Sequence, residues 1–276
     1  MALLEVKNLH TYFKTKKGTV KAVNDVSYSL DPGRTIGIVG ESGSGKSVSA
    51  MSILRLLDDN GYIASGSIRF DGKELTTLPL SDMYHIRGNA ISVIFQEPMT
   101  SLNPVFSVER QLCEPFMIHQ GMRKKEARRS ALKMLYDVQI PNPETVMRQY
   151  PHQLSGGMLQ RIMIGIAMAL QPELLIADEP TTAIDAVTQY EILEEFVRIK
   201  KNKNTAMLFI THDLGAISKV ADRILVMNSG HIVDSGDFEH IRNHANDPYT
   251  RLLIEKRSAV MCHYRDILHG KEISHA

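Results

Sequence analysis

The stretch GESGSGKS at residues 40–47 constrains the fold more than any other part of the chain. It follows the short apolar run Thr35–Val39, and the apolar residues after it repeat at helical spacing: Val48, Met51, Leu54 and Leu57. Strand, glycine-rich loop and helix in this order match the phosphate-binding pattern G-x-x-x-x-G-K-[ST]. A flexible Gly/Ser linker would need neither the lysine nor the buried flanking elements. The sequence therefore predicts a binding site for a nucleoside triphosphate.

The residue types of this loop indicate how it would work. Glycines let backbone amides turn toward phosphate oxygens, and the helix that begins near Lys46 adds the positive end of its dipole. We expect Lys46 to reach the β- and γ-phosphates and Ser47 to bind Mg2+. The predicted nucleotide-binding residues of the loop are Gly40, Glu41, Ser42, Gly43, Ser44, Gly45, Lys46, Ser47 and Val48.

Composition excludes several classes of protein. The 276 residues carry 32 Lys and Arg against 31 Asp and Glu, so the chain lacks the broad basic surface of a nucleic-acid-binding protein. Its two cysteines, Cys113 and Cys262, lie in no CxxC or Cys/His cluster, which argues against a disulfide scaffold or a structural zinc. The longest apolar run, Ile162–Leu170, is too short to cross a bilayer. We expect a soluble or peripheral protein without a nucleic-acid partner.

Apolar patterning along the chain predicts an α/β fold. Buried strands are expected at Thr35–Val39, Ala90–Phe95, Leu174–Ala177, Ala206–Ile210 and Ile224–Met227, with helices at Val187–Ile199 and Leu214–Val220 between them. Alternating strands and helices favour a mostly parallel sheet. Earlier strands are expected at Leu3–Leu9, Val20–Leu30 and Ser67–Phe70, and residues 108–170 read as a helical insertion. Residues after about 240 are polar and His-rich, typical of a peripheral tail.

Two adjacent carboxylates complete the chemistry that the residues themselves suggest. The apolar strand Leu174–Ala177 ends at Asp178 and Glu179, which places one acid near Mg2+ and the other near an attacking water. An ordinary glutamate has a pKa of about 4.3 and is a poor proton acceptor at neutral pH. We therefore expect Glu179 to orient and polarise the water.

The segment LSGGMLQR at residues 154–161 resembles the signature motif of ATP-binding cassette (ABC) ATPases. Ser155 is expected to cap the following helix, and Gly156 and Gly157 let the backbone close on phosphate. The resemblance implies that this tip meets the phosphate loop of a second cassette in a head-to-tail dimer. Two ATP molecules, each with Mg2+, would then lie at the interface.

Other positions resemble the family residue by residue, over about the first 250 residues. The resemblance implies catalytic roles for Glu179, His212, Gln96 and Lys46, and metal contacts from Ser47, Gln96 and Asp178. It also implies nucleotide contacts from Ser155, Gly156, Gly157 and Asp185. An aromatic residue should stack on adenine, for which Phe13 is preferred and Tyr12 is the alternative, because adjacent strand residues face opposite ways.

The implied architecture is α/β: a P-loop NTPase (ABC ATPase) core with an N-terminal antiparallel β subdomain and an inserted α-helical subdomain. Residues 1–97 and 171–240 would form the nucleotide-binding core with its β subdomain. Residues 98–170 would form the helical signature subdomain, and residues 241–276 a C-terminal extension.

Several stretches resemble the dipeptide/oligopeptide/nickel importer subfamily: residues 95–104, Met158, residues 179–185 and residues 247–250. The resemblance implies an ATP-hydrolysing subunit of a bacterial importer, peripheral on the cytoplasmic face of the membrane. Its partners would be a second ABC ATPase subunit, identical or homologous, two transmembrane permease subunits and, indirectly, an extracytoplasmic solute-binding protein. Cargo stays open between di- or oligopeptides and nickel or a metal chelate. A soluble ABC ATPase and a non-hydrolysing ATP-gated subunit are the alternatives.

Overall fold

The computed structural model describes residues 2–96, 101–182, 184–202 and 205–256. Its first layer is an antiparallel sheet of four strands in the order β2-β1-β4-β5. These strands are β1 (Leu4–Thr15), β2 (Gly18–Leu30), β4 (Gly61–Phe70) and β5 (Lys73–Glu74). Alternating buried residues on β1 and β2 turn one face of this sheet inward.

The second layer is a six-stranded sheet in the order β10-β9-β3-β8-β7-β6, parallel except for the edge strand β10. Its strands are β3 (Thr35–Val39), β6 (Ile91–Ile94), β7 (Leu174–Asp178), β8 (Ala206–Thr211), β9 (Arg223–Asn228) and β10 (His231–Gly236). Every residue of β3, β7 and β8 is buried, as expected for parallel strands covered on both faces.

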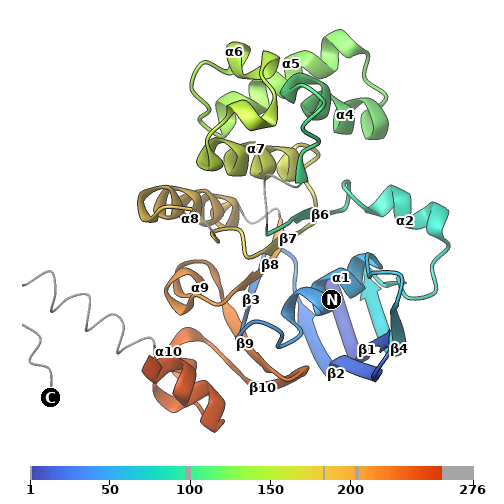
Figure 1. The fold of residues 1–276 in the computed structure, drawn as a ribbon, viewed down its shortest axis with the longest axis vertical. Coiled ribbons are helices and arrows are strands. Elements are labelled where there is room, and N and C mark those ends of the chain that lie inside the picture. The colour runs from blue at the N-terminus through green and yellow to red at the C-terminus, as the bar shows by residue number, and fades with distance from the viewer. Residues whose placement is uncertain (1, 97–100, 183, 203–204, 257–276) are drawn as a thin grey trace, which may run out of the picture.

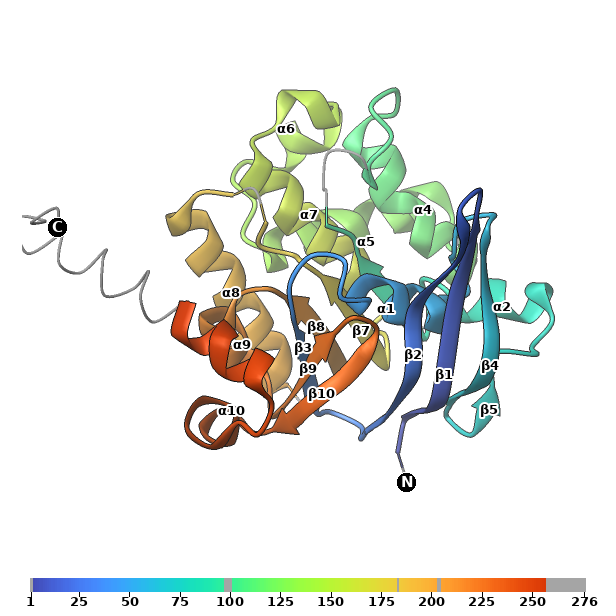
Figure 2. The same cartoon turned by 60° about the horizontal axis from the view of Figure 1, so that its bottom comes forward.

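Helices cover both faces of the parallel sheet. Helix α1 (Lys46–Leu54) packs between the two sheets, and one apolar core joins all three elements (Figure 2). A second core lies under α8 (Ala186–Lys201), α9 (Leu214–Val220) and α10 (Phe238–His244). The short helix α2 (Leu80–Ile86) lies on the side of the antiparallel sheet.

A group of helices lies at one end of the molecule, next to the edge of the parallel sheet that ends in β6 (Figure 1). It contains α4 (Val108–Gln120), α5 (Lys124–Asp137), α6 (Pro143–Arg148), the 3-10 turn Pro151–Gln153 and α7 (Gly156–Met168). This group has its own apolar core, in which Cys113 is buried. Gly121, with φ 64°, ends α4 in a left-handed conformation and separates it from α5.

The sequence-based strands agree with the observed ones within a few residues, although β1 and β4 extend well beyond the predicted ranges. The prediction of a peripheral tail after residue 240 is wrong for the part described here, because Ile241, Tyr249, Leu253 and Ile254 pack against the second core. None of the helices described is long and apolar enough to cross a membrane. Cys262 lies outside the described residues.

Candidate active site

The glycine-rich loop joins β3 to α1 and turns tightly where the sequence predicts a phosphate site. Gly43 and Gly45 have φ angles of 78° and 99°, in the left-handed region that favours glycine. A Cβ at Gly45 would also collide with the carbonyl oxygen of Ala22 in β2. Because of this close approach, the N-terminal sheet supports the loop directly before the first residue of α1.

Lys46 begins α1 and lies in the centre of the loop with 4% of its surface exposed. Its Nζ donates hydrogen bonds to the carbonyl oxygens of Gly40 at 2.8 Å and Glu41 at 2.9 Å. Burial lowers the pKa of Lys46, and the carboxylates of Glu179 and Asp178 counteract this by favouring the charged form. The loop thus encloses a cation opposite two acids.

Ser47 and Asp178 form a pair of oxygen ligands at the carboxyl end of β7. Ser47 Oγ donates a hydrogen bond of 2.9 Å to Asp178 Oδ1. Burial raises the pKa of Asp178, and the bond from Ser47 opposes this rise. Carboxylate and hydroxyl oxygens are the ligand types that Mg2+ prefers. Since the two residues come from different elements, the fold itself brings this donor pair together.

Glu179 follows Asp178 and has a left-handed backbone, with φ 46°, which is uncommon for a residue with a side chain. Its amide donates to the carbonyl of Ile210 in β8 at 2.9 Å. One carboxylate oxygen, Oε2, faces Gln96 Nε2 at 3.2 Å, Thr182 Oγ1 at 3.0 Å and His212 Nδ1 at 3.4 Å. Residues from three strand ends therefore converge on a single oxygen atom.

These side chains surround a cavity of about 570 Å³. Its lining residues are Ala22, Ser42, Gly43, Gly45, Lys46, Ser47, Val48, Gln96, Glu179 and His212. The cavity fits a triphosphate with Mg2+ by its donor set: a glycine loop at the start of a helix, a buried ammonium, and a serine–aspartate oxygen pair. The remaining predicted loop residues, Gly40, Glu41 and Ser44, lie in the loop but not on the cavity wall.

Comparison with known proteins decides the family. The family model described as "ABC transporter" matches residues 23–182. The oligopeptide transport ATP-binding protein AppD of Bacillus subtilis is 47% identical over 91% of this chain and 77% of its own length. The dipeptide transport ATP-binding protein DppD of Lactococcus lactis is 45% identical over 94% of this chain and 74% of its own length. The chain belongs to the ABC transporter family. It is an ATP-hydrolysing subunit of that family.

A solved ABC cassette has the same fold. MJ0796, a dimeric ATP-binding cassette in a post-hydrolysis state with ADP and Pi, superposes with a TM-score of 0.77 at 25% identity. The match covers 85% of this chain and 98% of MJ0796. The sheets, the helical group and the order of the elements are therefore those of an ABC ATPase.

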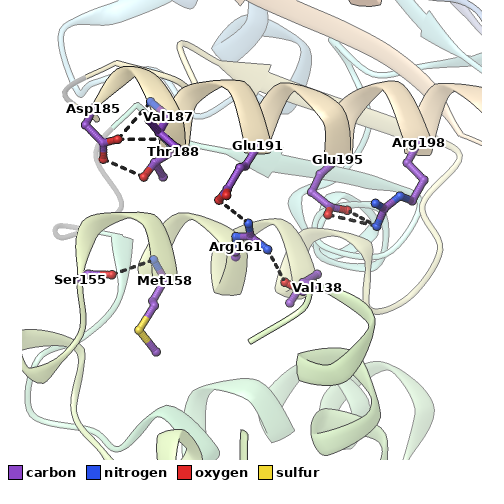
Figure 3. A network of polar contacts seen from close by, with 10 residues as sticks. All are labelled: Val138, Ser155, Met158, Arg161, Asp185, Val187, Thr188, Glu191, Glu195 and Arg198. Carbon is purple, nitrogen blue, oxygen red and sulfur yellow. Dashed lines mark hydrogen bonds and ion pairs between the residues drawn. The ribbon is translucent and has the colours of Figure 1, made fainter. Parts of the chain in front are cut away.

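The ABC signature residues lie apart from the cavity within one chain. Ser155 caps α7, as the sequence predicts, by accepting a hydrogen bond of 3.3 Å from the Met158 amide. Asp185 caps α8 by accepting bonds from the amides of Val187 and Thr188 at 3.1 and 3.0 Å. The N-terminal ends of these two helices lie side by side (Figure 3). None of the predicted contacts Ser155, Gly156, Gly157 and Asp185 lines the cavity.

Two contacts fasten the signature helix α7 in place. Arg161 Nη2 donates to Glu191 of α8 at 2.7 Å, and Arg161 Nη1 donates to the carbonyl oxygen of Val138 at 3.4 Å (Figure 3). Leu159 is completely buried in the core of the helical group. Its side chain therefore packs into this core and helps to hold α7 in the helical group.

The two candidates for adenine stacking lie on opposite faces of β1. Tyr12 donates to Asn24 Oδ1 at 3.2 Å and packs edge-on against Tyr62, with a centroid distance of 6.3 Å. Thr11, on the other face, bonds Ser52 of α1 at 2.8 Å. Phe13 shares the face of Thr11 by the alternation of the strand. It stays the preferred prediction, although it does not line the cavity.

Two residues at the site are not predicted by the sequence patterns described above. Ala22 lines the cavity from a bulged part of β2, and Thr182 donates to Glu179. An alanine in a strand carries no chemical signal. Thr182 could have been noticed from its spacing, because it lies three residues after Glu179 in a turn closed by a 3.1 Å bond between their backbones.

Proposed function

We propose that this chain energises the import of di- and oligopeptides by hydrolysing ATP at the cavity around Lys46. The observation that carries this proposal is that Lys46, Ser47 and Glu179 line one cavity, with Asp178 hydrogen-bonded to Ser47 beside it. The substrate class rests on relatives named as oligopeptide and dipeptide transport proteins, at 45–47% identity. Because these relatives are named for peptides, a nickel or metal-chelate cargo is not proposed.

Each residue has a role that follows from its position. The ammonium of Lys46 would neutralise phosphate charge, and the loop amides would surround the same oxygens. Ser47, Asp178 and Gln96 would hold Mg2+, which supplies charge neutralisation to the phosphates when it is bound. Glu179 would orient the attacking water. Gln96 and Thr182 donate hydrogen bonds to its Oε2, and His212 Nδ1 lies 3.4 Å from the same atom, so the carboxylate would be directed into the cavity before any reaction.

The proposed partners follow from the position of the signature residues. Because Ser155, Gly156, Gly157 and Asp185 lie away from their own cavity, a second cassette would have to bring its signature tip there. Phe13 would stack on the adenine of the same nucleotide. Residues 1–97 and 171–240 would act as the nucleotide-binding unit, residues 98–170 as the signature unit, and residues 241–276 as an extension. Two permease subunits would hold the pair at the inner face of the membrane and receive peptide from a binding protein.

The variant Lys46→Ala tests this proposal in the assembled transporter. Loss of a preorganised charge contact to phosphate costs about 100-fold or more in turnover. We expect ATP hydrolysis and uptake of a labelled tripeptide into proteoliposomes to fall together. Hydrolysis at the wild-type rate would refute the role of the loop. Intact hydrolysis by the unsubstituted complex without tripeptide uptake, while another solute is taken up, would refute the substrate class alone.

A further inference from the structure

We infer that Tyr249, which lies outside the two sheets and the helical group, is a positioning residue for the phosphate loop. Its hydroxyl oxygen accepts a hydrogen bond of 2.8 Å from the backbone amide of Glu41. Glu41 is the second residue of the loop, 208 positions away in the sequence. The inference rests on the proposed nucleotide site and adds a residue that sets its affinity.

The contact controls one particular peptide group. The amide of Glu41 and the carbonyl of Gly40 belong to the same planar unit, and that carbonyl accepts the 2.8 Å bond from Lys46 Nζ. Tyr249 therefore holds one end of the peptide group and Lys46 the other. A rotation of this group would break both hydrogen bonds, so the tyrosine hydroxyl fixes the direction of the carbonyl that positions the lysine.

The tyrosine itself is held rigidly. Residues 248–256 are helical, and Asp247 caps this helix by accepting a bond of 2.8 Å from the Tyr249 amide. The turn before the helix is tied to β10, where buried Asp234 accepts from the amides of Asn246 at 2.9 Å and Asp247 at 3.4 Å. Leu253 packs against the second core. These contacts with β10 and the second core fix the position of the Tyr249 hydroxyl next to the phosphate loop.

A second link between this helix and the loop is weak. Lys256 Nζ lies 3.2 Å from Glu41 Oε1, but the two side chains are 61% and 59% exposed. Ion pairs in that setting are screened by water and salt and contribute little. The hydroxyl of Tyr249 is therefore the contact that transmits the position of the helix to the loop.

The effect should appear in nucleotide affinity and not in the chemical step. Tyr249 does not line the cavity and has no hydrogen bond to Glu179, Gln96 or His212 among the bonds of the described residues. It acts on the ground-state shape of the loop, which a triphosphate meets on binding. Binding of ATP to a preorganised loop loses less conformational entropy than binding to a loose one. Loosening the loop should therefore weaken ATP binding and raise the ATP concentration at which hydrolysis is half-maximal.

The variant Tyr249→Phe tests the inference, because it removes the hydroxyl and keeps the packed ring. We expect the ATP concentration for half-maximal hydrolysis by the assembled transporter to rise about threefold to tenfold, the range for one lost neutral hydrogen bond. The maximal rate should change less than twofold. Competition of ATP against mant-ATP on the full chain should show the same shift. Tyr136→Phe, at an exposed position of α5, is the matched control and should leave both values unchanged.

The outcomes separate this inference from the proposed function. If Lys46→Ala abolishes mant-ATP binding and Tyr249→Phe binds like the wild type, the positioning role is wrong and the nucleotide site stands. A Tyr249→Phe variant with a lower maximal rate and an unchanged half-maximal concentration would also overturn the inference, since loss of folded protein produces that pattern. If Lys46→Ala binds normally, the nucleotide site itself falls.

Discussion

At the scale of single residues, the surroundings of Glu179 support its proposed role in orienting the attacking water. Its backbone is left-handed, and its Oε2 is approached by Gln96, Thr182 and His212. Such an unusual backbone conformation persists only where surrounding structure enforces it. The backbone strain and the converging side chains together support a functional role for this carboxylate.

Replacing Glu179 by glutamine should therefore stop hydrolysis and spare binding. The amide keeps the size of the side chain and an acceptor for Thr182, but loses the charge that polarises water. We expect phosphate release to fall at least about 100-fold, the typical loss when one preorganised electrostatic group is removed from an active site. Rapid-quench measurement with radiolabelled ATP would give the rate, and mant-ATP titration would give the affinity. Turnover close to that of the wild type would show that another group orients the water.

Much of this site was predictable from residue types, and the exceptions have physical reasons. Lys46, Ser47 and Asp178 carry their chemistry in the side chain and stand in recognisable spacing. Ala22 contributes only a backbone position, and Tyr249 reaches Glu41 from the far end of the chain. A close approach of the Ala22 backbone and a hydrogen bond between residues 208 positions apart produce no pattern in the local sequence. These two contacts are therefore seen only in the folded chain.

At the scale of elements, Glu74 fastens the short strand β5 to β4. Its carboxylate accepts bonds from the amides of Ile68 at 3.0 Å and Thr76 at 3.3 Å, and from the hydroxyls of Ser67 and Thr76. Burial raises the pKa of Glu74, but the hydrogen bonds outweigh it and lower the pKa from 4.5 to about 2. The native state thus binds this proton less tightly than the unfolded chain.

The sign of the pH effect follows from that difference. A lowered pKa contributes stability that is complete above the unfolded value and is lost as the pH falls from about 5 toward 2. Glu74→Gln should lower the free energy of unfolding by about 1–3 kcal/mol at pH 7 and flatten the acid decline. Urea denaturation followed by circular dichroism between pH 7 and 3 measures both. Glu144→Gln, at an exposed site in the first turn of α6, is the control. Parallel pH profiles for Glu74→Gln and wild type would contradict the assignment.

The signature helix depends on a glycine that brings α7 against α8. A Cβ at Gly157 would lie 2.5 Å from Thr188 Cγ2, and Thr188 cannot turn away freely because its hydroxyl donates to Asp185 at 2.7 Å. At Gly156 the nearest atom to such a Cβ, Ile184 Cγ2, is 3.8 Å away. The tight contact therefore lies at the second glycine of the motif.

Gly157→Ala should separate the two helix tips and be rescued by a change in the neighbour. We expect about 1–3 kcal/mol of destabilisation, the usual cost of overpacking, together with loss of ATP hydrolysis. Thr188→Ser removes the obstructing methyl and keeps the hydroxyl for Asp185, so the double variant should regain most of the stability. A double-mutant cycle of unfolding free energies measures this coupling. If the changes in unfolding free energy of the two single variants simply add in the double variant, the proposed steric contact between positions 157 and 188 is wrong.

The elements themselves were predictable where apolar periodicity is strong and less so where tertiary contacts decide. Residues of β3 and α9 were predicted to their observed ends, since both are bounded by turn or cap residues. The helix α2 and the edge strand β10 have little apolar periodicity and were missed. The residues after about 240 are mostly polar, so their sequence favours a peripheral position. In the helix at residues 248–256, however, Tyr249, Leu253 and Ile254 pack against the second core.

At the scale of the whole molecule, the predicted nucleotide contacts lie in two separate places of the fold. The cavity of Lys46 and Glu179 lies at the strand ends, while Ser155 caps a helix of the separate helical group and lines no part of it. The related cassette MJ0796 is described as dimeric in its solved structures, at a TM-score of 0.77. A head-to-tail pair is the arrangement that lets the helix tip of one copy complete the cavity of another.

ATP should therefore hold two cassettes together when it cannot be hydrolysed. With Glu179→Gln, we expect multi-angle light scattering of the full chain to show the mass of a dimer with ATP and the mass of a monomer with ADP. The reason is that the γ-phosphate, which ADP lacks, would bind both to the phosphate loop of one copy and to the N-terminal end of α7 in the other. The measurement needs the chain alone and the chain mixed with a homologous cassette, since either could be the natural partner. Ser155→Arg is the matched disruptive variant: the added bulk at the tip should prevent association while mant-ATP still binds to the cavity of each copy. If ATP binds to Glu179→Gln and the mass stays single in both mixtures, the completed site does not form between cassettes.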